Sequence, residues 1–92
     1  MADELVVGTI TAVAEHPGAR APSLLLTLDL GTHGTQEAVL PTGTYDKSEL
    51  QNKQVVCRRT PDGAAIVGVH SHGSGFVLLS PLDDVEPGSL VD

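Results

Sequence analysis

Two histidines and two serines share one glycine-rich stretch, His70-Ser-His-Gly-Ser-Gly75. In a strand, His70 and His72 would lie on the same face, and together with His33 or a carboxylate they could bind zinc. Structural zinc sites in small domains usually contain closely spaced Cys and His pairs, and this chain has a single cysteine. The stretch is more typical of a loop, so we expect a loop here and no metal site.

Catalytic motifs are equally weak. Gly73-Ser74-Gly75 lacks the Gly-x-Ser-x-Gly pattern of a nucleophile elbow, and no Gly-Lys-Ser/Thr follows to bind a phosphate. The neighbouring acids Asp83, Asp84 and Glu86 stand beside a Pro-Gly turn and are typical of a solvated surface. We therefore expect neither enzymatic activity nor a cofactor.

The charge balance is strongly acidic. The 92 residues contain 12 acidic and 5 basic side chains, which gives a net charge of −7, and the only adjacent basic pair is Arg58-Arg59. Such a surface disfavours general binding to nucleic acids and to anionic membranes, so no membrane partner is expected. An excess of acids with few lysines is also typical of a protein from a high-salt cytoplasm, which we keep as a hypothesis.

The single cysteine and the N-terminus indicate a compartment. Cys57 cannot form an intramolecular disulfide, and the Met1-Ala-Asp-Glu4 start lacks the basic and apolar regions of a signal peptide. Both features predict a cytoplasmic protein. Cys57 follows two valines, so we interpret it as a buried hydrophobic residue rather than a reactive thiol.

Short apolar runs alternate with Gly and Pro along the chain, a pattern typical of an all-β barrel. One domain over residues 1–92 is expected, built as a five-stranded OB-fold Greek-key barrel with one short helical turn. The Leu24–Leu30 run places four leucines on one face, and Thr44–Lys53 favours the helical turn. The expected strands are Leu5–Ala14, Leu24–Leu30, Thr35–Leu40, Gln54–Arg59 and Phe76–Leu79, with Ala64–Val69 either a strand or an irregular connection.

Several segments, taken in order, resemble the tRNA-binding OB-fold domain, a family that includes free-standing dimeric tRNA-binding proteins and the CsaA-type export chaperones. The resemblance covers nearly the whole chain. It rests on segments such as Val6-Val-Gly-Thr-Ile10, Glu15-His-Pro-Gly-Ala-Arg20, Tyr45-Asp-Lys-Ser-Glu-Leu50, Gly68-Val-His-Ser-His-Gly73 and Val85-Glu-Pro-Gly-Ser-Leu-Val91.

This resemblance implies a non-enzymatic homodimer that binds tRNA or other RNA. The residues expected to do so are Arg58 and Arg59 at phosphates, Ser71 and His72 at a base or sugar edge, and Arg20 at the rim. Ala19-Arg-Ala-Pro22 is closer to the chaperone version of its loop, so the alternative is a chaperone that binds extended polypeptide segments. The dimer contact is expected at Leu82–Val91 and the first strand.

Overall fold

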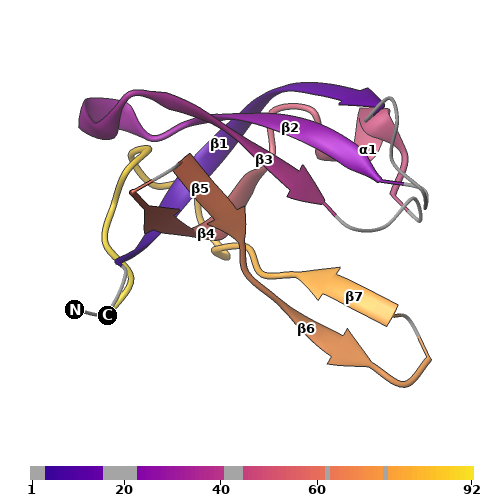
Figure 1. Cartoon of the computed structure of the whole chain (residues 1–92). Helices are drawn as coiled ribbons and strands as arrows, with labels where there is room; N and C mark the ends of the chain where they lie inside the picture. Colours follow the sequence, from indigo (N-terminus) through magenta and orange to yellow (C-terminus); the bar gives the residue numbers. More distant parts are fainter. Residues whose placement is uncertain (1–3, 16–22, 41–44, 62, 74) are drawn as a thin grey trace.

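Seven strands and two short helical segments follow one another in the described part of the chain (Figure 1). The computed structural model describes residues 4–15, 23–40, 45–61, 63–73 and 75–92. The four strands expected before residue 60 are confirmed, with each end within one residue of its expected position. The elements are β1 (Leu5–Glu15), β2 (Leu24–Asp29), η1 (Gly31–His33), β3 (Thr35–Leu40), α1 (Lys47–Leu50), β4 (Gln54–Thr60), β5 (Gly63–Ile66), β6 (Gly68–Ser71) and β7 (Gly75–Leu78).

β1 is the strand around which the barrel is built, because it pairs with two neighbours. Its first half pairs with β4, from Leu5 opposite Arg58 to Thr9 opposite Gln54, and its second half pairs with β2. A bulge between Ile10 and Ala12 interrupts the register with β2, and a bulge of this kind bends a strand. The antiparallel order is β3-β2-β1-β4-β5, and β3 and β5 contact each other to nearly close the expected all-β OB-fold Greek-key barrel.

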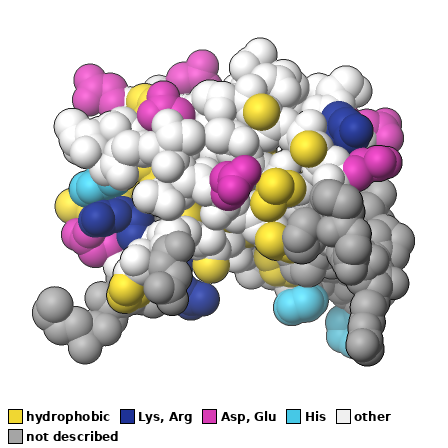
Figure 2. All heavy atoms as spheres, turned by 45° about the horizontal axis from the view of Figure 1, so that its top comes forward, with side chains coloured by type: hydrophobic (Ala, Val, Ile, Leu, Met, Phe, Trp, Pro, Cys, Tyr) yellow, Lys and Arg dark blue, Asp and Glu magenta, His cyan; other side chains and the backbone are white. Residues whose placement is uncertain are grey.

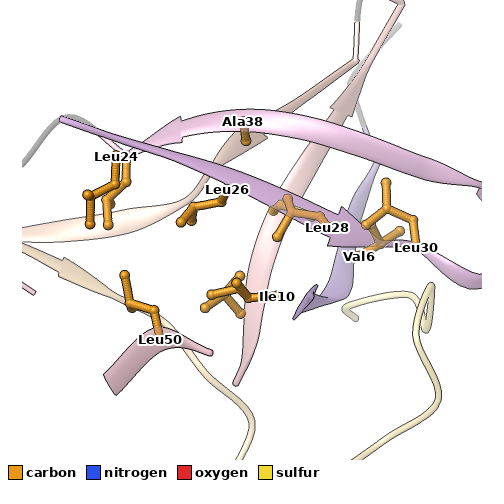
Figure 3. Packing of buried hydrophobic residues seen from close by; sticks show 11 residues of the cluster. Val6, Ile10, Leu24, Leu26, Leu28, Leu30, Ala38 and Leu50 are labelled. Carbon is orange, nitrogen blue, oxygen red and sulfur yellow. The ribbon is translucent and has the colours of Figure 1, made fainter. Parts of the chain in front are cut away.

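Alternating leucines of β2 fill the barrel. Leu24, Leu26, Leu28 and the following Leu30 are all buried, as their expected common face requires. Figure 3 shows the β2 leucines pointing toward Ile10 of β1 and Leu50 of α1. The remaining buried members of this core come from β1, β3 and β4, namely Val6, Ala38, Leu40, Val55 and Cys57.

Cys57 is completely buried, which confirms its interpretation as a core residue. Burial disfavours the thiolate and raises the pKa of this thiol to about 11, from an ordinary value of 9.0. The thiol therefore stays protonated and unreactive in the folded protein at neutral pH.

The free energy of unfolding should consequently fall as the pH rises from about 9 to about 11, by up to about 3 kcal/mol from this group. In that window the unfolded chain releases the Cys57 proton while the folded chain retains it. Urea unfolding at a series of pH values measures the loss. The Cys57→Val variant should lose less stability over the same range, and equal losses in both proteins would contradict this assignment.

The helical turn was predicted correctly, whereas the loop over His70–Gly75 was predicted only in part. The turn is confirmed as α1, where the Glu49 carboxylate accepts a hydrogen bond from the Asp46 N–H at 2.9 Å. The loop expected over His70–Gly75 is wrong at its ends, because His70 and Ser71 belong to β6 and Gly75 belongs to β7, while His72 and Gly73 lie in the turn between these paired strands. The Phe76 ring packs on the barrel core and meets the His70 ring edge-on at 5.4 Å, which holds this short strand in place.

The C-terminal segment, residues 80–92, returns to β1. The Gly88 N–H donates to the Val7 carbonyl at 2.7 Å and the Val7 N–H donates to the Ser89 carbonyl at 2.9 Å. Val6 and Leu90 form a bridge beside them. The segment therefore lies along the first half of β1 within the same chain. No helix in the described ranges is long and apolar enough to cross a membrane.

Candidate functional site

Arg58 and Arg59 lie side by side in the sequence but on opposite faces of β4. Side chains alternate along a strand, and buried Cys57 fixes the inner face. Arg58 is exposed on the outer face, opposite Leu5 of β1 and Ala65 of β5. Arg59 is two residues after Cys57, so it lies on the same face of β4 as Cys57, near the end of the strand. The two guanidinium groups therefore do not extend from β4 as one basic patch.

Arg59 is paired with an acid. Its Nη1 donates to Oε1 of Glu4 at 2.5 Å, and its backbone N–H donates to the Glu4 carbonyl at 2.9 Å. Both side chains remain partly exposed, so the pair contributes at most about 1 kcal/mol to stability. Its larger consequence is electrostatic, because an RNA phosphate approaching Arg59 would meet the Glu4 carboxylate.

Ser71 and His72 lie where β6 ends, at the tip of the β6–β7 hairpin, and both are exposed. Arg58 pairs with Ala65 of β5, and the chain continues from β5 through β6 to this tip. The β6–β7 hairpin points away from the barrel (Figure 1). The structure therefore separates Ser71 and His72 from the arginines of β4. Arg20, the fifth expected residue, lies outside the described residues.

The visible charges are mixed rather than grouped by sign. On the face in Figure 2, dark blue Lys and Arg side chains lie beside magenta Asp and Glu side chains, and hydrophobic side chains gather between them. No continuous basic surface crosses this face. Within the described ranges, no group of three or more His, Cys, Asp and Glu side chains has the arrangement of a metal site.

An open cavity of about 210 Å³ lies where α1, the start of β4 and the end of β7 meet. Its apolar walls are the side chains of Tyr45, Leu50, Val55 and Leu78. Its polar walls are Glu49, Lys53, Gln54 and Ser80. The Tyr45 hydroxyl accepts a hydrogen bond from the Leu78 N–H at 3.2 Å, which connects the segment before α1 to β7. This site can hold one apolar group beside polar hydrogen-bonding groups.

Gln54 holds the C-terminal segment beside this cavity. Its Nε2 donates to the Val85 carbonyl at 2.6 Å and to Thr9 Oγ1 at 3.1 Å, while its Oε1 accepts from the Val85 N–H at 2.9 Å. This nearly buried amide therefore has its hydrogen bonds satisfied. The two bonds to Val85 fix the backbone of the C-terminal segment to Gln54, whose side chain lines the cavity.

The cavity was missed by reasoning from the sequence. Its walls come from three segments whose contact depends on the folded hairpin and on the return of the C-terminal chain. The available signal was the Tyr45–Leu50 segment, which contains one of only two aromatic residues in the chain and which resembles a family motif.

Together, these features define a small OB-fold barrel with an added hairpin and an apolar surface cavity. Solved structures share this architecture. The chaperone CsaA of Picrophilus torridus has 26% sequence identity and a TM-score of 0.89, covering 98% of this chain and 92% of that chain. The CsaA of Bacillus anthracis has 24% identity and a TM-score of 0.88, covering 98% of this chain and 91% of that one.

A more distant structure has the same fold. The MetRS-related protein of Pyrococcus horikoshii has 13% identity and a TM-score of 0.74, covering 97% of this chain and 89% of that chain. No protein-family model and no curated protein sequence matches the chain. The structural neighbours include two chaperones, and they support the fold that the sequence resemblance predicted.

Proposed function

We propose that this chain is a non-enzymatic binding module that holds extended polypeptide segments, as a chaperone does. The observation that carries the proposal is the open cavity between α1 and β7, whose apolar walls reach the surface of a protein with a net charge of −7. The likeness to the CsaA chaperone of Picrophilus torridus supports the same function. An acidic binding protein favours segments that combine apolar and basic side chains.

Binding of tRNA or other RNA is the second candidate. Arg58 on the outer face of β4, and Ser71 and His72 at the exposed hairpin tip, are the described residues that favour it. Two features weigh against it. Single-stranded nucleic acids bind basic grooves with aromatic platforms, and phosphate neutralisation supplies much of the affinity. This chain has five basic residues and two aromatic ones, and Arg59 already contacts Glu4.

A fluorescence anisotropy titration separates the two functions. The probes are a labelled peptide of alternating Lys and Thr with one central Leu, the same peptide with Glu in place of Lys, and labelled tRNA. We expect the Lys peptide to bind about tenfold or more tightly than the Glu peptide in low salt, and the difference to shrink in molar KCl because salt screens the charges.

We expect no tRNA binding in either salt. Binding of tRNA that weakens with salt and falls in the Arg58→Ala/Arg59→Ala double variant would instead establish the RNA function. Binding of neither peptide would reject the polypeptide function. Circular dichroism in the same two buffers tests the high-salt hypothesis, which predicts incomplete folding in dilute buffer.

We also propose that the chain forms a homodimer in the cytoplasm through its C-terminal segment and β1. Leu82 and Leu90 are largely exposed and Val85 and Val91 are partly exposed, although the backbone of the segment is fixed on β1. A barrel this small gains stability when a second copy covers such side chains. Sedimentation equilibrium at micromolar concentration should give twice the 9.5 kDa chain mass. A monomer would contradict the proposal.

A further inference from the structure

Among the described residues, no strand pairs with the outer edge of β7. The β6–β7 sheet has two strands within the described residues, so β7 has no neighbouring strand there on its far side. The Leu78 N–H points to this side, because it donates to the Tyr45 hydroxyl rather than to β6. Hydrogen-bonded and non-hydrogen-bonded pairs alternate in an antiparallel ladder, so the backbone N–H and C=O of Phe76 point to the same outer edge.

The cavity lies at the end of this edge. Leu78 belongs both to this edge and to the cavity wall. Tyr45, whose hydroxyl accepts the hydrogen bond from the Leu78 N–H, also lines the cavity. A volume of about 210 Å³ is smaller than the roughly 300–1,000 Å³ of sites for drug-sized ligands. It suits a single apolar side chain that extends from a strand running along β7.

We propose that an extended polypeptide adds to the outer edge of β7 as a third strand and places one aliphatic side chain in the cavity between α1 and β7. This proposal rests on the polypeptide-binding function above and specifies its mode. Backbone hydrogen bonds to a strand edge accept many sequences, while a side-chain pocket adds a preference. Both properties suit a protein that must hold unrelated chains.

The Tyr45 hydroxyl has a defined part in this mode. Its hydrogen bond with the Leu78 N–H, at 3.2 Å, keeps that edge donor satisfied when the peptide is absent. An incoming peptide carbonyl replaces the hydroxyl on the same donor. Glu49 and Lys53 are the charged residues of the cavity wall, and the chain as a whole has a net charge of −7. A basic residue next to the aliphatic anchor is therefore attracted by Glu49 and by the overall negative charge.

The cavity is tested with the Lys-Thr peptide that contains one central Leu. Replacing this Leu with Ala should weaken binding about tenfold, because the anchor no longer fills the cavity. Ser80→Trp should have a similar effect on the Leu peptide, since Ser80 is exposed and lines the cavity. Thr35→Trp places the same side chain at the exposed start of β3 and should leave binding unchanged.

The strand edge is tested with two N-methylated forms of the peptide. In one form the methyl groups are on the odd-numbered residues, and in the other they are on the even-numbered residues. Only alternate N–H groups of an added strand face β7, so one form should lose at least about tenfold in affinity while the other binds like the parent.

Equal binding of the two methylated forms, or full binding by Ser80→Trp, would overturn this mode while peptide binding itself remained. Absence of binding by the unmodified peptide would instead reject the polypeptide-binding function. Weak binding by one methylated form and by Ser80→Trp, together with full binding by Thr35→Trp, is the result that supports the proposal.

Discussion

Replacing Gly31 with alanine should lower the free energy of unfolding by about 2–5 kcal/mol. Gly31 has a φ of +63°, and a Cβ at this position would lie 2.2 Å from the Pro87 carbonyl oxygen. Backbone cannot move aside as a flexible side chain can, so the C-terminal segment must shift away from the end of β2. Thermal unfolding should show a loss of roughly 10 °C or more in Tm.

Gly75→Ala is the matched control for this substitution. Gly75 also has a positive φ, +73°, but an added Cβ would meet no atom within 4 Å. This variant should therefore lose only the conformational cost, about 1–2 kcal/mol. If the two variants lost the same stability, close contact between the β2 end and the C-terminal segment would not be important for stability.

Leu50→Ala should cost about 2–5 kcal/mol in unfolding free energy and should also weaken peptide binding. Leu50 is the only buried residue of the four-residue helix α1 and belongs to the barrel core. A helix this short does not form by itself in water, so it depends on this side chain for its position. Its loss removes one apolar wall of the cavity.

Ser48→Ala is the control on the same helix. Ser48 is exposed, and its replacement should change the unfolding free energy by no more than about 0.5 kcal/mol. Urea unfolding followed by circular dichroism measures both variants. A loss below about 1 kcal/mol in Leu50→Ala would show that α1 is held by other contacts.

The barrel was largely predictable because its strands carry regular alternation. The four leucines between Leu24 and Leu30 identify one buried face of β2 without any knowledge of neighbouring strands. The short helix was indicated by polar residues that tolerate helix ahead of buried Leu50. β7 was expected as Phe76–Leu79 and is confirmed, but the His70–Ser71 part of β6 was missed because these residues carry no apolar alternation and their strand depends on pairing with Phe76 and Gly75.

The candidate site was less predictable because its contacts join distant parts of the chain. Gln54 and Val85 are 31 residues apart in the sequence, and nothing in either segment alone indicates their pairing. Glu4 and Arg59 are 55 residues apart, so the neutralised arginine could not be foreseen. The opposite faces of Arg58 and Arg59, however, follow directly from the alternation expected for a strand.

The most direct test of the polypeptide-binding function is an NMR titration of ¹⁵N-labelled protein with the Lys-Thr-Leu peptide and, separately, with tRNA. We expect the peptide to shift the backbone amide signals of Phe76, Leu78 and Lys53, around the outer edge of β7 and the cavity, and tRNA to shift none of them. Shifts at Arg58 and Ser71 on addition of tRNA, with no response to the peptide, would contradict it.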